Sequence, residues 1–175
     1  GWNQDVPGEP AFPHQTPPPR VSTPVEQTAP ERLEISVSSD AAAKAVLCEE
    51  LARGSMGFAA GVCMQGSTAT STIHEWGSDA LKQQYLQPAL RGEKVGAFAI
   101  TEPNAGSDAA SLKTRAVRAE GGYVLNGSKI FTTNGTVADF ITVVATVDPA
   151  AGTRGLELFL VDTSWAGFKV GRKLD

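Results

Sequence analysis

Two clusters of small polar residues, each placed where an apolar stretch ends, carry the groups best suited to binding chemistry. The first, AITEPNAGSD over residues 99–108, presents the Thr101 hydroxyl, a turn and the Ser107 hydroxyl after a strand-like run. The second, FTTNG over residues 131–135, combines hydroxyls with an aromatic ring. Backbone amides and hydroxyls at strand ends can bind carbonyl or phosphate oxygens. Together the clusters could hold a flat, hydrogen-bonding ring system; the alternative is a pair of solvated turns.

Neither cluster fits the common glycine-rich nucleotide-binding motifs. Gly106 lacks companion glycines at the Rossmann spacing, and no helix-plus-strand unit follows it. A P-loop is excluded because the chain has no Gly-Lys-Ser or Gly-Lys-Thr. The acidic residues have structural explanations, since Glu102 adjoins Pro103 in the turn and Asp108 suits a turn or a helix cap. The residues alone therefore identify no catalytic acid or base.

The histidines and cysteines form no recognisable metal or redox motif. Cys48 and Cys63 have no matching spacing, and both lie in apolar, helix-like sequence, so we predict buried free thiols. His74 is expected in the last turn of a helix, where a histidine suits the helix dipole. His14 has no nearby ligand partner and is assigned no role. We predict no metal site.

Composition places the chain among ordinary globular proteins. Of 175 residues, 41% are hydrophobic and 19% are charged, with a formal net charge of -4. A net negative charge does not favour binding to nucleic acid, and the sequence has no run of basic residues that would favour an anionic membrane. No apolar run is long enough to span a bilayer. With few cysteines and no signal-peptide pattern, we expect a cytoplasmic protein.

The chain divides into three parts by composition. Residues 1–38 hold eight of the eleven prolines and are predicted to be an extended or disordered segment, because proline blocks helices and removes donors. Residues 39–94 are predicted to form a partial helical domain. Residues 95–175 are predicted to form a β domain that is incomplete at its C-terminus. A linker or wrapped arm is the preferred interpretation of the first part over a polyproline ligand.

Three stretches of the second part have helical patterns, at residues 38–54, 58–76 and 78–90. The first begins with capping residues and ends in a basic turn followed by glycine. The second is small and apolar on nearly all sides, which predicts a buried helix. In the third, Ser78 is the expected N-cap, Tyr85 and Leu86 share an apolar side with Leu81, and Pro88 is expected to break or kink the helix.

The third part has the period of β-strands. We predict a turn at Glu120–Gly122 and a hairpin turning at Asn126-Gly127, because that dipeptide readily adopts the positive φ of a two-residue turn. Helices followed by antiparallel strands indicate an α+β fold rather than alternating βαβ units. The thin helical part and the exposed sheet edge suggest a fragment or a chain that needs a partner. Strand patterns occur at residues 95–101, 113–119, 123–125, 128–133, 139–147 and 156–162.

The order of these segments resembles the acyl-CoA dehydrogenase family. The likeness rests on YLQPALRGEKVGAFAITEPNAGSDAASLKT, then YVLNGSKIFTTNGTVADFITVVATVDP, then GLELFLVD. It runs from about residue 41 to residue 175, and the proline-rich residues lie outside it. It implies part of an N-terminal helical domain followed by an antiparallel, β-barrel-like middle domain. The family's C-terminal four-helix domain has no counterpart in this sequence.

The resemblance implies that FAD binds at the first cluster. Phe98 matches the aromatic position that begins the family's flavin-binding stretch, which continues through Ala99 and Ile100. Thr101 matches the threonine whose hydroxyl and backbone serve the flavin ring. Ser107 matches a serine that contacts both the cofactor and the pantetheine or phosphate region of acyl-CoA. Ser107 is therefore also the expected substrate-binding residue.

The second cluster is implied to face the same flavin. Phe131 stands where the family most often has tryptophan against the ring. Thr133 matches the threonine that hydrogen-bonds near flavin N5. Thr132 replaces a usual isoleucine, a mild departure that we still include among the cofactor-binding residues.

The implied reaction is the α,β-dehydrogenation of an acyl-CoA thioester in fatty acid metabolism. A base removes the α-proton while the β-carbon gives hydride to flavin N5. The family's base is a glutamate of the C-terminal domain, so no catalytic residue is assigned here and Glu102 is not proposed as one. The implied partners are an electron-transfer flavoprotein and further subunits of a homotetramer. The alternatives are an acyl-CoA oxidase, a flavin monooxygenase of the same fold, and a non-catalytic remnant acting as an interaction module.

Overall fold

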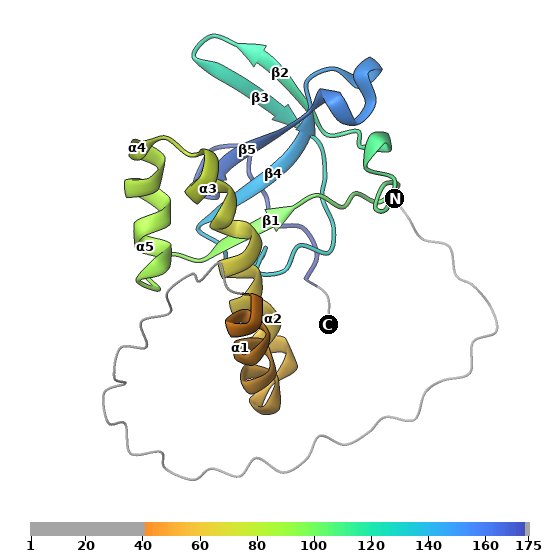
Figure 1. The fold of residues 1–175 in the computed structure, drawn as a ribbon. Coiled ribbons are helices and arrows are strands. Elements are labelled where there is room, and N and C mark those ends of the chain that lie inside the picture. The colour runs from red at the N-terminus through yellow and green to blue at the C-terminus, as the bar shows by residue number, and fades with distance from the viewer. Residues whose placement is uncertain (1–40, 174–175) are drawn as a thin grey trace, which may run out of the picture. The chain divides into compact units, whose positions relative to one another are not determined.

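The computed structural model describes residues 41–173, so the predictions for the proline-rich segment and for the first helix cap lie outside the described residues. Helices run from Ala41 to Leu90, and from Gly96 onward the described chain forms strands with two short 3-10 helices between them (Figure 1). This arrangement confirms the predicted α+β class. None of the helices in residues 41–173 has the length and apolar content needed to span a bilayer.

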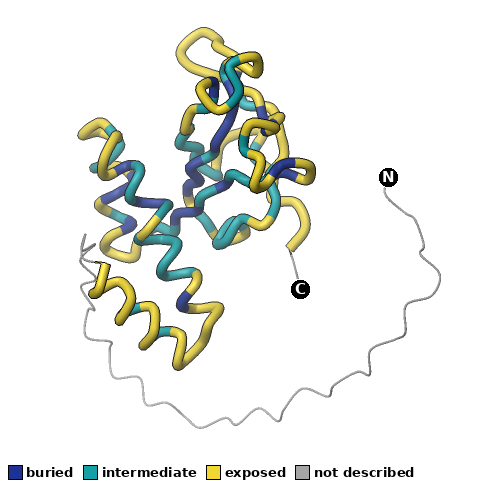
Figure 2. Tube along the Cα trace, turned by 45° about the vertical axis from the view of Figure 1, so that its right-hand side comes forward, coloured by how far each residue is buried: buried dark blue, intermediate teal, exposed yellow. Residues whose placement is uncertain are grey.

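The first two helices form an antiparallel pair. Helix α1 spans Ala41–Gly54 and ends, as predicted, in a basic turn followed by glycine. Helix α2 spans Met56–Met64, and its N-cap Ser55 accepts a hydrogen bond from the Phe58 amide at 3.3 Å. Helix α1 has no buried residue, and Figure 2 shows it exposed along almost its whole length. The apolar contact between α1 and the rest of the chain is therefore small.

The second helical stretch is interrupted rather than continuous. A π-helical turn at Gln65–Ala69 separates α2 from helix α3, Ser71–Trp76. The hydroxyl of Thr70 donates to the Gln65 carbonyl at 2.9 Å and that of Thr68 to the Met64 carbonyl at 3.0 Å. Such bonds from side chains back to the helix favour local distortion. The prediction of a helix buried on nearly all sides is wrong, because most of these residues are half-buried or exposed.

The third helical stretch continues through its proline. Helix α4, Asp79–Leu81, is capped by Ser78 as predicted, and a π-helical turn at Lys82–Leu86 leads into helix α5, Gln87–Leu90. Pro88 therefore does not end the helix. Proline has no amide hydrogen to donate, and its ring crowds the preceding turn. Just before Pro88 the backbone bonds already follow the π-helical pattern, since the Gln87 amide donates to the Lys82 carbonyl.

These helices pack on the sheet through one aromatic contact. Tyr85 and Leu86 are buried as predicted, and Leu81 packs partly against the same cluster. The rings of Tyr85 and Phe140 meet edge to face with their centroids 5.4 Å apart. The Tyr85 hydroxyl also donates to Asp162 at 3.2 Å. Burial, followed by this hydrogen bond, raises the pKa of Tyr85, so its hydroxyl stays protonated at neutral pH.

The sheet is open and mixed. Strand β4 is central: β5 pairs antiparallel along one side of it, while β1 and then β2 pair parallel on the other side. Strand β3 pairs antiparallel with β2. The predicted β segment is therefore present, although the sheet is not closed and is not wholly antiparallel. The strands are β1 Gly96–Ala99, β2 Arg115–Ala119, β3 Gly122–Asn126, β4 Phe140–Thr146 and β5 Leu156–Asp162.

The turn predicted at Glu120–Gly122 is confirmed and joins β2 to β3, whereas the predicted hairpin turn at Asn126-Gly127 is wrong. Ala119 pairs with Gly122, and Gly121 in the turn has a positive φ of 79°, which glycine adopts at little steric cost. Gly127 serves a different purpose, because a Cβ there would overlap the Thr114 side chain. The glycine permits close approach of two chain segments at the end of β3.

Strand β1 has apolar contacts on both faces. Ala97 and Ala99 pack with Ile141 on one face. Phe98 and Ile100 pack against the cluster that contains Val144 on the other face. Strand β4 is buried along almost its whole length, as Figure 2 shows in dark blue. Burial on both faces explains why the β4 sequence is continuously β-branched and apolar rather than alternating.

Candidate functional site

The structure brings the two polar clusters together. The Ile130 amide donates to the Thr101 carbonyl at 2.9 Å, which joins the segment leading into FTTNG to the end of β1. The turn after Thr101 is closed by paired backbone bonds between Glu102 and Ala105, at 2.8 and 3.2 Å. A methyl carbon of Thr101 approaches Gly106, since a Cβ on that glycine would lie 3.9 Å from it. The segment before the second cluster is therefore bonded to the end of β1, although the strand predicted at residues 128–133 is wrong, since β3 ends at Asn126.

A buried ion pair between Glu102 and Lys129 lies beside the two clusters. The Lys129 ammonium donates to Glu102 Oε1 at 2.8 Å and to the Ile100 carbonyl at 2.9 Å. The other contacts of the carboxylate are backbone amides, from Lys113 to Oε2 at 2.7 Å and from Thr114 to Oε1 at 2.9 Å. The Lys129 side chain is 10% exposed and the Glu102 side chain is 6% exposed. One buried carboxylate thus ties the two clusters to the start of β2.

These contacts decide the protonation state of Glu102. Burial alone would raise its pKa, but the hydrogen bonds from Lys129 and from the amides outweigh burial and lower the pKa to about 2. A carboxylate with that pKa and with both oxygens occupied is a poor proton acceptor. Glu102 is therefore a structural residue, in agreement with its exclusion as a base. The Asp108 carboxylate accepts from the Ser111 hydroxyl at the start of a short helical turn.

The second cluster holds an exposed aromatic ring on an unusual backbone. Phe131 is 69% exposed and has a φ of 54°, which non-glycine residues rarely adopt. Thr132 and Thr133 follow it and are both half-buried. Strained backbone is commonly kept where it positions functional groups. The loop therefore presents a ring beside two hydroxyl-bearing residues.

Asn134 holds this loop in place and was missed as a site residue by the sequence reasoning. It also has positive φ, 65°, and its side-chain amide donates to the Gly61 carbonyl of α2 at 3.0 Å and to the Gly96 carbonyl of β1 at 3.4 Å. The signal available in the sequence was the Asn-Gly dipeptide at this position, which favours left-handed backbone.

The predicted cofactor-binding residues differ in what they can offer a ligand. Ala99 is buried, and Phe98 and Ile100 pack with the apolar cluster under the sheet, so these three can reach a ligand chiefly through backbone groups. Thr101 is half-buried and Ser107 is exposed. Hydroxyls of Thr101, Ser107 and the two threonines of the second cluster remain as candidate donors. Among residues 41–173, no group of three or more His, Cys, Asp or Glu side chains is placed to hold a metal ion.

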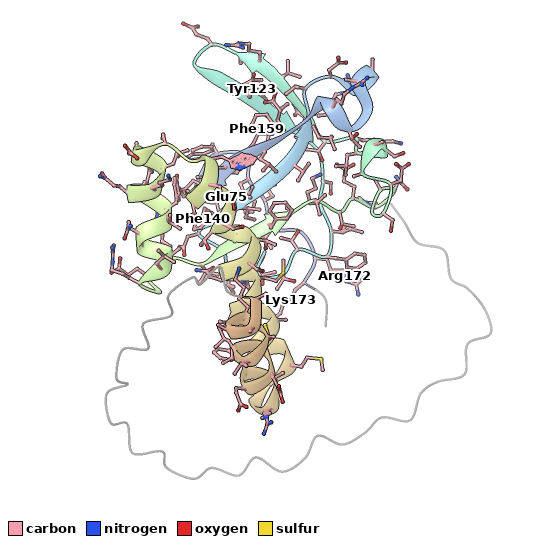
Figure 3. The ribbon with its side chains drawn as sticks, viewed as in Figure 1. Glu75, Tyr123, Phe140, Phe159, Arg172 and Lys173 are labelled. Atoms are coloured by element: carbon pink, nitrogen blue, oxygen red, sulfur yellow. The ribbon has the colours of Figure 1, made fainter. Side chains whose placement is uncertain are left out.

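A second hollow lies between the β2–β3 hairpin and β5. Tyr123 and Phe159 face one another there, with ring centroids 5.2 Å apart (Figure 3). The remaining lining is largely apolar and includes Trp165. Its lining includes no serine or threonine, so the two polar clusters remain the better candidate site.

Comparison with known proteins gives two adjacent family matches. The acyl-CoA dehydrogenase N-terminal domain matches residues 28–93, and the acyl-CoA dehydrogenase middle domain matches residues 97–175. Both candidate clusters fall within the second match. The boundary between the two matches lies between the last helix and the first strand.

Individual relatives agree with these matches. The chain is 45% identical over 106 residues to a short-chain-specific acyl-CoA dehydrogenase of Clostridium acetobutylicum, covering 61% of this chain and 28% of that protein. The butyryl-CoA dehydrogenase structure from Megasphaera elsdenii aligns with a TM-score of 0.71 at 41% identity, covering 73% of this chain and 34% of that one. An FAD complex of PigA aligns with a TM-score of 0.71 at 35% identity, covering 75% and 35%. The chain thus spans about a third of the length of such relatives.

Proposed function

This chain belongs to the acyl-CoA dehydrogenase family, and we propose that the complete protein carries out FAD-dependent α,β-dehydrogenation of an acyl-CoA thioester. In this proposal residues 95–135 supply part of the wall that faces the flavin. The observation that carries the proposal is the junction of the two clusters through the Ile130–Thr101 backbone bond. This bond supports the proposal because it joins the end of β1 to the segment that carries Phe131, Thr132 and Thr133.

The residues present fit an isoalloxazine ring. Phe131 offers an exposed ring face, and the positive φ of the residue keeps that ring on the loop rather than in the core. Thr101 and Thr133 are half-buried and offer hydroxyls, which can donate to carbonyl oxygens or ring nitrogens. FAD bound here would supply the hydride acceptor for the β-carbon of the substrate.

The chain's own residues act by positioning in this proposal. Hydroxyl donors of Thr101 and Thr133 would orient the cofactor and stabilise negative charge on it, and Phe131 would exclude water from one face. Ser107 would contact the pantetheine or phosphate part of the substrate. The buried ion pair of Glu102 and Lys129 keeps both strand ends in register. No residue among 41–173 is assigned as the base that removes the α-proton.

The partners follow from the same proposal. Reduced flavin must pass its electrons onward, and an electron-transfer flavoprotein is the proposed acceptor. One structure that aligns with this chain, at a TM-score of 0.71, is described as an electron transferring flavoprotein of Acidaminococcus fermentans. Assembly into a homotetramer and a role in fatty acid metabolism in the cytoplasm belong to the proposal as well. An oxidase of the same fold would instead pass electrons to oxygen.

The test uses the complete natural protein. We expect it to purify with bound FAD, to bleach when butyryl-CoA is added without oxygen, and to reduce an electron-acceptor dye. Thr133→Val should lower the rate of bleaching at least ~10-fold, because removal of a preorganised donor weakens charge stabilisation. Thr136→Val, which removes an exposed hydroxyl from the same loop, is the matched control and should be unchanged.

Other outcomes separate the alternatives. Stoichiometric hydrogen peroxide with no need for an acceptor dye would favour the oxidase. A folded, colourless protein that binds no added FAD would refute the proposal and favour a non-catalytic interaction module. Bleaching that is equally fast in both threonine variants would leave the reaction standing and remove Thr133 from it.

A further inference from the structure

Two thiols on neighbouring helices lie in contact although fifteen residues separate them. The sulfur atoms of Cys48 on α1 and Cys63 on α2 are 2.8 Å apart. Both cysteines are free thiols. A disulfide bond is about 2.05 Å long, so closing it would bring the sulfurs together by less than about 1 Å. The prediction that both thiols are buried is wrong, since Cys48 is exposed and Cys63 is half-buried.

The two thiols differ in their surroundings. The hydrogen bond with Cys48, followed by burial, raises the pKa of Cys63 and favours its protonated form. Cys48 lies on the solvent-exposed helix, where an incoming reagent can reach it. The rate at which a thiolate attacks a disulfide depends in part on how accessible the thiolate is. Cys48 is therefore the thiol that reacts first, and Cys63 is the neighbour that resolves the product.

A covalent link between α1 and α2 would add a second connection to a helix pair in which α1 has little buried surface. Leu47 and Leu51 are the only residues of α1 that are even half-buried, while α1 and α2 lie side by side (Figure 1). The chain reverses between them at Ser55, whose amide donates to the Leu51 carbonyl at 3.1 Å. The turn fixes one end of the helix pair, and the two cysteines lie away from that turn.

We propose that Cys48 and Cys63 form a reversible disulfide site that responds to low-molecular-mass disulfides such as oxidised glutathione. The Cys48 thiolate attacks one glutathione sulfur, breaks the glutathione disulfide and releases one reduced glutathione. The Cys63 thiolate then attacks the Cys48 sulfur and releases the second glutathione. The two protein thiols are oxidised by two electrons, oxidised glutathione is reduced to two thiols, and the two protons pass to the glutathione thiolates.

The test uses the complete natural protein, reduced and then incubated with excess oxidised glutathione. Remaining thiols are trapped with an alkylating reagent, and intact mass and peptide mapping identify the products. We expect a Cys48–Cys63 cross-linked peptide and a protein lighter by two hydrogen atoms. The internal disulfide should exceed the mixed disulfide at least ~10-fold, because the resolving thiol is held beside its target. Added reduced glutathione should reverse the change.

Serine variants test the assigned order. Cys63→Ser removes the resolving thiol, so Cys48 should accumulate as a stable mixed disulfide with glutathione. Cys48→Ser should leave Cys63 mainly unmodified under the same conditions. The FAD content of each variant checks that it is folded. Full alkylation of both cysteines in the unsubstituted protein, or two bound glutathiones without a cross-link, would overturn the proposal. Equal glutathione uptake by the two single variants would overturn the assigned order of attack.

Discussion

The buried ion pair of Glu102 and Lys129 allows a quantitative prediction. Lys129→Met keeps a side chain of similar length but removes the charge that faces a carboxylate whose side chain is only 6% exposed. Removal of one partner from a buried pair typically costs about 3–5 kcal/mol, because the remaining charge lacks its counterion. We expect the free energy of unfolding of the complete protein to fall by about 3 kcal/mol at pH 7. The backbone amides that still bind Glu102 place the cost at the lower end of that range.

The lowered pKa of Glu102 reflects all of its contacts together, of which Lys129 is only one. A fall from an ordinary 4.5 to about 2 in the folded state is about 2.5 units, or roughly 3 kcal/mol at 1.36 kcal/mol per unit. Because the folded pKa is the lower one, this stability is fully present above pH 4.5. It is lost as the pH falls from 4.5 toward 2, where the folded carboxylate also takes up a proton.

Urea denaturation at several pH values measures both effects. The difference in unfolding free energy between the unsubstituted protein and Lys129→Met should be largest at neutral pH and should shrink below pH 4.5. Arg53→Gln is the matched control, because the Arg53–Glu49 pair is exposed, with both side chains 66% accessible. That change should cost less than about 1 kcal/mol. A Lys129→Met protein within 1 kcal/mol of the unsubstituted protein at pH 7 would refute the anchoring argument.

Three further changes test the packing around the site by urea denaturation. Asn134→Ala removes the bonds to α2 and β1 and should cost about 1–3 kcal/mol; an unchanged midpoint would show that this residue does not hold the loop. Gly127→Ala should cost about 1–3 kcal/mol, since its Cβ would overlap Thr114, while Gly66→Ala, with open space around it, should not destabilise comparably. Phe140→Ala empties a fully buried position and should cost about 3–5 kcal/mol, and a loss below 1 kcal/mol would contradict its central place in the core.

The elements with the clearest local pattern were predictable from the sequence. The β-branched run that became β4 and the alternating run that became β5 both form where expected. The cap at Ser78 and the apolar side containing Tyr85 also follow from spacing alone, since a helix places such residues on one face. The roles assigned to Thr101, Thr133 and the other cofactor-binding residues stay predictions.

The errors arose where the types of the residues at a position do not by themselves decide its structure. Asn126-Gly127 has the composition of a tight turn, yet glycine is needed there because a Cβ would overlap the Thr114 side chain. Pro88 is tolerated because a π-helical turn precedes it, and local propensity does not encode that turn. The contact between Cys48 and Cys63 depends on how two helices pair, so spacing along the chain could not reveal it.

Within residues 41–173, β1 pairs with a strand on one side only, and two side-chain amides bind its backbone on the other side. On the side of Gly96 away from β4, its amide donates to Gln65 Oε1 at 2.6 Å, and its carbonyl accepts from Asn134. Gln65 Nε2 completes the pattern by donating to the Lys94 carbonyl at 2.8 Å. Unpaired strand edges invite pairing with other chains. Because Gln65 and Asn134 occupy the backbone groups of Gly96, that end of β1 is less available for pairing with another chain, and Asn134 also contacts the loop proposed to face the flavin.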